Sequence, residues 1–157
     1  MTNIIKQKIS FEEVSRLCHA LAEKVEKNGF KPDLIVGISR GGWVPASLVS
    51  DFLNVGFVVS VGVKSYAAVG VKKQPIIREN LGMDIQNMNV LVVDDIVDTG
   101  ETLKLIKDHL EDLGASEIKS VVMHLKPWAK IKPDYFVEET TNWPVYPWES
   151  AEDERKL

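Results

Sequence analysis

Apolar residues in the first part of the chain recur at the spacing of one helix face. Between residues 11 and 25 they stand three or four positions apart, as expected for an amphipathic helix. Ser10 and Glu13 form a capping-box pattern at its start, and Asn28-Gly29 is a typical helix stop. The pattern therefore predicts a helix that begins after Ser10 and ends at Asn28-Gly29.

Short apolar runs alternate with helical patterns through most of the remaining chain. Strands are expected at residues 33–38, 56–64, 90–94, 120–124 and 134–137, and helices at residues 44–53 and 103–113. Pro45 fits the first turn of its helix, where a missing N–H costs little, and Gly114 closes the later helix. Because strands and helices alternate, we expect one α/β domain over residues 1–157, with a mainly parallel central sheet flanked by helices.

In three stretches the apolar residues follow neither the helical nor the strand spacing over any length. Residues 65–88 contain glycines, lysines and a proline, and we expect a flexible loop there, in which residues 76–78 can return as a hairpin. Residues 125–149 mix prolines with aromatic residues, and we expect them to form a small C-terminal hood. Residues 150–157 are a charged tail that is expected to fray.

Composition narrows the class of protein. A chain of 157 residues can bury a sizeable core without a disulfide, and its single cysteine, Cys18, favours a reducing compartment. The net charge of −4 does not suggest a nucleic-acid partner. No signal core stands at the N-terminus, and no run reaches the roughly 18 apolar residues of a membrane span. We therefore expect a cytoplasmic protein with neither nucleic acid nor membrane as a partner.

Residues 89–103 bring together several polar residues that could bind a ligand. Their apolar run ends in Asp94 and Asp95, and Asp98 then opens a short turn with glycine and threonine before a helical pattern. Such a corner lies at the carboxyl end of a strand, where open α/β sheets bind ligands. Loop N–H groups and a helix dipole suit a phosphate, whereas carboxylates suit hydroxyls or a divalent cation. The segment predicts a phosphorylated, hydroxyl-bearing ligand.

A second glycine-containing turn follows the strand at residues 33–38. Gly37-Ile38-Ser39-Arg40-Gly41 matches G-x-S-x-G, the nucleophile elbow of serine hydrolases, and Asp94 and His124 follow in the chain order of a triad. The other interpretation is a loop whose N–H groups and Arg40 guanidinium grip a diphosphate. A serine hydrolase that uses Ser39 is therefore one alternative to a phosphate-binding protein.

The segment VLVVDDIVDTGETL resembles the phosphoribosyl-diphosphate (PRPP) binding signature of the type I phosphoribosyltransferases, and Ser39-Arg40-Gly41-Gly42 is similar to their pyrophosphate loop. Residues 30–149 are most similar to the short 6-oxopurine branch, the hypoxanthine and xanthine–guanine enzymes. The resemblance implies a purine-salvage enzyme that transfers 5-phosphoribosyl from PRPP to N9 of hypoxanthine, guanine or xanthine. It also implies Mg²⁺, a nucleoside monophosphate and pyrophosphate as products, and a homodimer or homotetramer.

The resemblance also implies roles for individual residues. Asp94 and Asp95 would hold the ribose hydroxyls, directly or through Mg²⁺, which requires the strand to end there because neighbouring strand residues face opposite ways. Asp98 would be the general base toward N7 of the purine, and a helix-cap acceptor is its alternative role. The 5′-phosphate would be bound by Asp98, Thr99, Gly100, Glu101 and Thr102, and Glu101 would contribute its backbone N–H. Pyrophosphate would meet Ser39, Arg40, Gly41, Gly42 and Lys64.

The base site implied by the resemblance lies in the C-terminal hood. The Lys126 ammonium would donate to the 6-oxo group of the purine, and Trp143 and Val145 would supply stacking surface. Packing in the core or at a subunit interface is the alternative for this tryptophan-rich segment, whereas Trp43 and Trp128 have no expected role beyond packing. The prolines around Trp143 depart from the family pattern. A non-catalytic regulator of the same fold that binds nucleotides or RNA is a further alternative.

Overall fold

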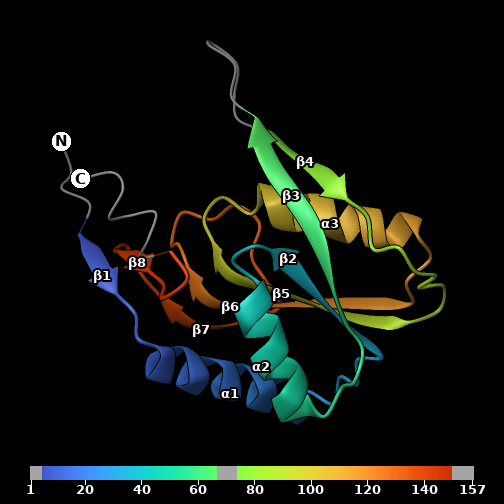
Figure 1. Cartoon of the computed structure of the whole chain (residues 1–157), viewed down its shortest axis with the longest axis horizontal. Helices are drawn as coiled ribbons and strands as arrows, with labels where there is room; N and C mark the ends of the chain where they lie inside the picture. Colours follow the sequence, from blue (N-terminus) through green and yellow to red (C-terminus); the bar gives the residue numbers. More distant parts are fainter. Residues whose placement is uncertain (1–4, 67–73, 150–157) are drawn as a thin grey trace.

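A six-stranded sheet forms the centre of the structure, a computed structural model that describes residues 5–66 and 74–149 (Figure 1). Its strand order is β4-β3-β2-β5-β6-β7, and every neighbouring pair is parallel except β3 and β4. The strands are β2 (Leu34–Ser39), β3 (Val58–Tyr66), β4 (Gln74–Glu79), β5 (Asn89–Val97), β6 (Glu117–Leu125) and β7 (Tyr135–Glu139). The predicted mainly parallel α/β fold is confirmed.

Helices cover both faces of this sheet. Helices α1 (Phe11–Lys27) and α2 (Trp43–Leu53) pack on one face, and α3 (Glu101–Asp112) packs on the other (Figure 1). The Ser10 hydroxyl accepts a hydrogen bond from the backbone N–H of Glu13 at 3.1 Å, as the capping-box pattern predicts. Pro45 lies in the first turn of α2, also as expected.

Alternate residues of the central strands enter two separate cores. Leu91 and Val93 of β5 pack with the apolar side of α1 and α2, whereas Val90 and Val92 pack with the apolar side of α3. This alternation is the period-2 geometry of a strand whose two faces are both covered. The same alternation determines which face of the sheet Asp94 and Asp95, the next residues of β5, point to.

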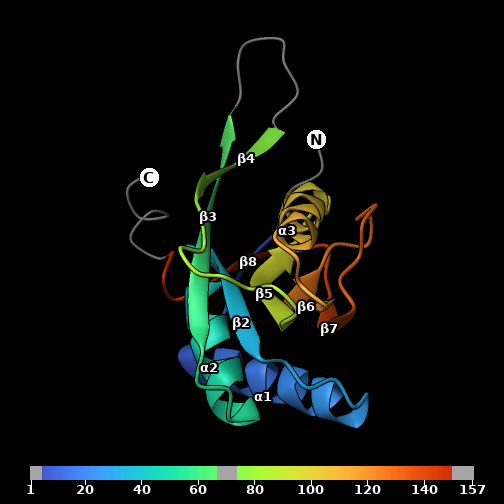
Figure 2. The same cartoon turned by 90° about the vertical axis from the view of Figure 1, so that its right-hand side faces the viewer.

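Strands β3 and β4 extend beyond the other strands as an arm (Figures 1 and 2). The expected hairpin return at residues 76–78 is confirmed, because β4 pairs antiparallel with β3, whereas the expected loop is wrong at residues 65–66, 74–75 and 79, which are also strand. Pro75 is compatible with β4 because β4 is an edge strand, where proline is tolerated. Lys64 pairs with Ile76 on this arm, and residues 67–73 at its tip lie outside the described residues.

A small second sheet joins the two ends of the described chain. Strand β1 (Lys6–Lys8) pairs in parallel with β8 (Trp143–Val145). The expected hood over residues 125–149 is narrower than predicted, because β7 belongs to the central sheet. The expected tail at residues 150–157 lies outside the described residues. Within residues 5–66 and 74–149, no helix is long and apolar enough to cross a bilayer.

Candidate active site

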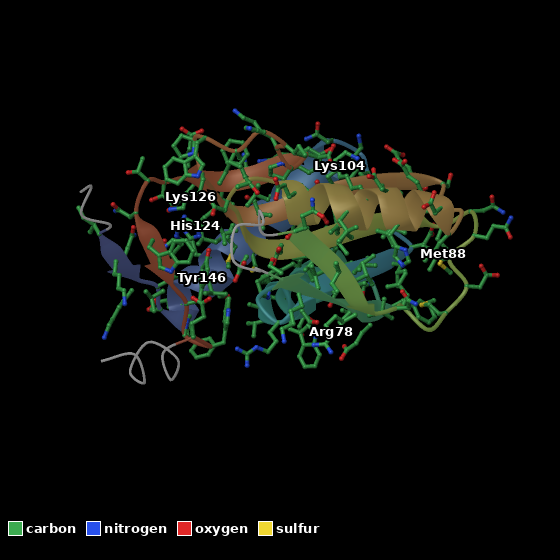
Figure 3. The ribbon with its side chains drawn as sticks, turned by 90° about the horizontal axis from the view of Figure 1, so that it is seen from above. Arg78, Met88, Lys104, His124, Lys126 and Tyr146 are labelled. Carbon is green, nitrogen blue, oxygen red and sulfur yellow. The ribbon has the colours of Figure 1, made fainter. Side chains whose placement is uncertain are left out.

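The loops that carry the predicted site residues emerge at one edge of the sheet. Strands β2, β5 and β6 are parallel neighbours, so their carboxyl ends lie side by side. They lead directly into residues 39–42, 98–102 and 126–131. Lys126, His124 and Tyr146 gather at the opposite end of the molecule from Met88, which precedes β5 (Figure 3). Ligands bind at this edge in open α/β sheets.

Strand β5 does not end at the acidic pair, contrary to the expectation. Its pairing with β2 ends at Val93, but its pairing with β6 continues to Val97. Asp94 therefore continues the alternation toward α3, where it lines a pocket with Thr99 and Leu103. Asp95 points to the other face, toward Gly41. The two carboxylates flank the strand where β2 leaves it.

Both carboxyl groups of the pair are held in a poorly solvated position. Burial raises the pKa of Asp94 well above its usual value, and the neighbouring Asp95 charge raises it further. Burial also raises the pKa of Asp95 to about 6, with a contribution from the Glu149 charge. The carboxylates are therefore costly to ionise in the free protein. A hydroxyl donor or a cation next to either carboxylate would offset that cost.

The turn after β2 packs directly on this pair. An added Cβ at Gly41 would collide with the Asp95 carboxylate, and one at Gly42 would collide with the carbonyl oxygen of Val93. Only glycine allows the loop this close to β5. The Ser39–Arg40 peptide bond is cis, and the Arg40 side chain is exposed. The predicted diphosphate loop and the predicted acidic pair are thus in contact.

The turn after β5 forms the N-terminus of α3. Gly100, with φ of 92°, is the N-cap residue of α3, and the Thr99 hydroxyl accepts a hydrogen bond from the backbone N–H of Glu101 at 3.4 Å. The helix-cap alternative for Asp98 is therefore not what the structure shows. Its Oδ1 instead accepts a hydrogen bond from the Trp128 indole N–H at 2.7 Å. The polar side chains that line the pocket before α3 are Asp94, Asp98, Thr99 and Thr102, and a helix N-terminus of this kind favours an anion.

The Lys126 side chain is buried at the start of the loop after β6. Its Nζ donates a hydrogen bond to the carbonyl oxygen of Asn142 and lies 5.3 Å from the Trp128 ring centroid and 5.5 Å from that of Trp143. Burial lowers the pKa of Lys126, and the charge of Asp98 opposes this shift. Two exposed indoles therefore flank one desolvated ammonium.

The second predicted stacking residue, Val145, is placed differently. Its side chain is only 7% exposed, and its carbonyl oxygen accepts a hydrogen bond from the Ile9 backbone N–H at 3.0 Å. The structure packs Val145 inside and does not bring its side chain to open surface. Trp143, at 42% exposure, is the accessible aromatic residue of β8.

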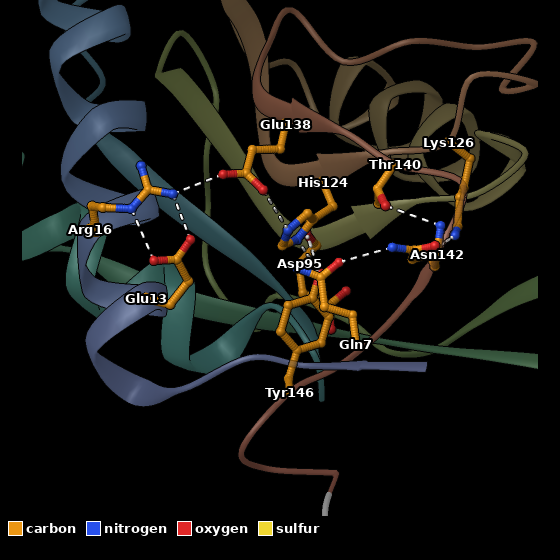
Figure 4. Close-up of polar contacts among 10 residues, drawn as sticks. All are labelled: Gln7, Glu13, Arg16, Asp95, His124, Lys126, Glu138, Thr140, Asn142 and Tyr146. Atoms are coloured by element: carbon orange, nitrogen blue, oxygen red, sulfur yellow. Dashed lines mark hydrogen bonds and ion pairs between the residues drawn. The ribbon is translucent and has the colours of Figure 1, made fainter. Parts of the chain in front are cut away.

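A hydrogen-bonded chain that the sequence did not reveal passes behind the acidic pair (Figure 4). The Tyr146 hydroxyl donates to the Asp95 carbonyl oxygen at 3.2 Å and lies 2.8 Å from Nδ1 of His124. Because the hydroxyl has one proton, Nδ1–H of His124 is the donor to Tyr146. Nε2 of His124 lies 3.5 Å from Oε2 of Glu138, and Arg16 donates a hydrogen bond to Oε1 of the same carboxylate at 2.8 Å. Only tertiary structure brings these residues together.

These contacts do not assemble a hydrolase triad. The Ser39 hydroxyl donates to the Val61 carbonyl oxygen at 3.3 Å. The imidazole of His124 bonds to Tyr146 and faces Glu138. A serine nucleophile requires a base within hydrogen-bond reach. The geometry therefore gives no support to a hydrolase that uses Ser39.

The acidic pair has the donor chemistry of a magnesium site. Within residues 5–66 and 74–149, no group of three His, Cys, Asp or Glu side chains gathers around one point. Mg²⁺ commonly keeps several waters and takes one or two carboxylates together with the phosphates of its substrate. Asp94 and Asp95 fit a cation that arrives with a diphosphate ligand.

A model of the phosphoribosyl transferase domain matches residues 8–155, and the protein belongs to this family. The chain is 32% identical to the xanthine-guanine phosphoribosyltransferase of Idiomarina loihiensis, over 90% of this chain and 85% of that protein. It is 30% identical to the hypoxanthine-guanine phosphoribosyltransferase of Saccharomyces cerevisiae, over 94% of this chain and 87% of that protein. The solved purine phosphoribosyltransferase of Pyrococcus horikoshii Ot3 is 38% identical, with a TM-score of 0.81 and coverage of 91% and 93% of the two chains. The family resemblance seen in the sequence is confirmed.

Proposed function

We propose that this protein is a purine phosphoribosyltransferase of salvage metabolism. It transfers the 5-phosphoribosyl group of PRPP to N9 of a 6-oxopurine, releasing pyrophosphate and forming a nucleoside monophosphate. The observation that carries the proposal is the convergence of three loops at one sheet edge. The first loop is the glycine turn that packs on the acidic pair, and the second leads into the N-terminus of α3, which can bind an anion. The third carries Lys126, whose ammonium group lies between the rings of Trp128 and Trp143.

PRPP would lie across the carboxyl ends of β2 and β5. Its 5′-phosphate would take N–H groups of residues 98–102, which lead into α3. The pyrophosphate would take residues 39–42, where glycines permit a close approach, and Arg40 would supply a charged donor. The ribose hydroxyls would lie between these two sites, beside Asp94 and Asp95. Lys64 would reach the pyrophosphate from the arm, where it pairs with Ile76.

Asp94 and Asp95 would also hold Mg²⁺, because hard carboxylate oxygens are its preferred protein ligands. Bound there with PRPP, the cation supplies positive charge that neutralises the diphosphate leaving group. The raised pKa of both aspartates supports this assignment, because a cation lowers the cost of their ionisation. Because Asp94 and Asp95 lie on opposite faces of β5, the ligand would have to reach both sides of the strand beyond the point where β2 has left it.

The purine would lie against Trp143, with its 6-oxo group toward Lys126. An ammonium donates to a carbonyl oxygen but not to the amino group of adenine, so the lysine selects 6-oxopurines. The exposed face of Trp143 would add stacking worth about 1–3 kcal/mol. Asp98 would accept the proton that the base loses as N9 attacks C1 of the ribose. Orientation and charge stabilisation carry the reaction in this proposal, without a covalent intermediate.

The protein would act as a homodimer or homotetramer. Trp43, Phe57 and Val58 are large apolar residues that lie exposed at the start of α2 and around the start of β3. Exposed apolar groups of this kind commonly mark an interface. Light scattering coupled to size exclusion gives the mass directly, and replacement of Trp43 by Lys should lower it if this face is the contact.

One assay tests the proposed reaction. Purified protein is incubated with PRPP, Mg²⁺ and a panel of purine and pyrimidine bases, and nucleotide formation is measured. We expect product with hypoxanthine, guanine or xanthine and little with adenine or uracil. Binding of nucleotide without product from any base would favour a non-catalytic regulator. Labelling by a fluorophosphonate that disappears in Ser39→Ala would favour a hydrolase.

A further inference from the structure

Trp128 contacts the two side chains that the proposed reaction places around the purine. Its indole N–H donates to Oδ1 of Asp98 at 2.7 Å, and its ring centroid lies 5.3 Å from Nζ of Lys126. Asp98 stands before α3, whereas Trp128 and Lys126 come from the loop after β6. One residue therefore joins the carboxylate to the segment that carries the base-recognising lysine.

The backbone holds Trp128 firmly in this place. The N–H of Lys126 donates to the Val97 carbonyl oxygen at 2.9 Å, and the N–H groups of Lys130 and Ile131 donate to that of Thr99 at 3.1 and 3.3 Å. The N–H of Ala129 closes the turn onto the Lys126 carbonyl oxygen at 3.0 Å. These bonds on both sides of Trp128 lock the two loops together, so the indole meets Asp98 from a fixed position.

The contact restricts the carboxylate in a specific way. Asp98 is exposed, and its alternative anchor as a cap of α3 is not made. A free aspartate would rotate about its side-chain bonds, and only some orientations face a purine. A charge-assisted bond to Oδ1 restricts the rotation of the carboxylate and leaves Oδ2 as the oxygen that can accept a proton from the purine. Orientation of this kind lowers the entropy lost on reaching the transition state.

We propose that Trp128 is a positioning residue for this reaction, in that its indole N–H fixes the Asp98 carboxylate toward the base. The inference rests on the proposed function, in which Asp98 accepts the proton of the purine. It differs from a stacking role, because the ring face could be supplied by any aromatic residue but the N–H could not. Phenylalanine at this position separates the two roles.

The test compares Trp128→Phe, Asp98→Asn and the double variant by steady-state kinetics. Trp128→Phe keeps an aromatic face beside Lys126 and removes the donor. We expect its kcat to fall about tenfold, the size of a lost bond to a charged group, while KM for PRPP stays within about twofold. In the Asp98→Asn background, the same substitution should cause no further loss, because the two residues act as one unit.

Two further measurements keep the outcome unambiguous. Trp128 is 54% exposed, so thermal unfolding of Trp128→Phe should match the wild type and exclude misfolding. Trp143→Phe changes the other indole beside Lys126 and should act mainly on KM for the base. An active wild type with unchanged kcat in Trp128→Phe, or losses that multiply in the double variant, would overturn the inference alone. A wild type that is inactive with every base would overturn the proposed function and this inference with it.

Discussion

The hydroxyl of Tyr146 donates a hydrogen bond to the backbone carbonyl of Asp95 at 3.2 Å. This bond ties the segment after β8 to the strand that carries the acidic pair. Tyr146 is 1% exposed, stacks on Trp148 with ring centroids 4.9 Å apart, and also meets His124. Because Trp143 lies three residues before it, the tyrosine connects the proposed base site to the proposed PRPP site.

Tyr146→Phe should destabilise the protein and weaken PRPP binding. The substitution leaves the Asp95 carbonyl oxygen and Nδ1 of His124 without their buried partner, which should cost about 1–3 kcal/mol in the free energy of unfolding. Denaturant unfolding measures this cost, and KM for PRPP should rise. Tyr135→Phe is the control, because Tyr135 lines a pocket with Asn89 and Glu117 at the other end of the strands. Equal effects of the two substitutions would contradict the assigned link.

Because the glycine turn packs closely on β5, adding one methyl group at Gly41 should weaken PRPP binding. Gly41→Ala would push a Cβ into the Asp95 carboxylate, and such overpacking typically costs about 1–3 kcal/mol. We expect PRPP affinity to fall about tenfold or more, as measured by calorimetry with Mg²⁺. Gly56→Ala is the matched control, because a Cβ there meets nothing within 4 Å. Normal PRPP affinity in Gly41→Ala would show that the loop does not need this approach.

Long periodic elements could be predicted from the sequence, because their pattern is local. Helix α1 carries its cap, its apolar stripe and its stop within about 20 consecutive positions. The cores of β2 and β5 are continuous apolar runs, which is the pattern of strands covered on both faces. The PRPP-like segment was equally visible, since all of its residues are consecutive.

Features that depend on distant partners could not be predicted in this way. Strand β1 has three exposed polar residues and exists only because β8 pairs with it. The extension of β5 beyond Asp94 depends on β6, which stays paired after β2 has left. The bond from Trp128 to Asp98 joins residues 30 positions apart. No local propensity signals such a contact, so Trp128 looked like a packing residue.

The acidic pair predicts opposite effects on binding and stability. Replacing Asp94 and Asp95 together by Asn should weaken PRPP binding in Mg²⁺, because the carboxylates would no longer bind the cation or accept from the ribose. The free protein should become more stable, because asparagine removes the cost of ionising two poorly solvated carboxyl groups. Asp51→Asn, at an exposed position of α2, is the control. Calorimetry and thermal unfolding without ligand measure the two effects, and normal PRPP binding would refute the assignment.

Lys126→Met should remove recognition of the 6-oxo group while leaving PRPP binding intact. Methionine fills the buried volume but cannot donate, so kcat/KM for a 6-oxopurine should fall about 10- to 100-fold, with KM for PRPP nearly unchanged. Lys130→Met is the control, because Lys130 lies exposed in the same loop and its backbone bond to Thr99 survives the substitution. A parallel rise in KM for PRPP would indicate that Lys126 supports the whole site instead of the base alone.

The buried His124 predicts a loss of stability on acidification. Burial lowers its pKa in the folded protein, against opposing effects of Glu138 and Glu13 and a smaller lowering by Lys126. Below about pH 6.5 the unfolded chain therefore binds more protons at this residue than the folded protein does. The free energy of unfolding consequently decreases as the pH is lowered. His124→Gln should flatten this slope between about pH 8 and pH 5.5 in denaturant titrations. Glu138→Gln should steepen it, because its charge no longer favours the imidazolium, and equal slopes in all three proteins would contradict the assignment.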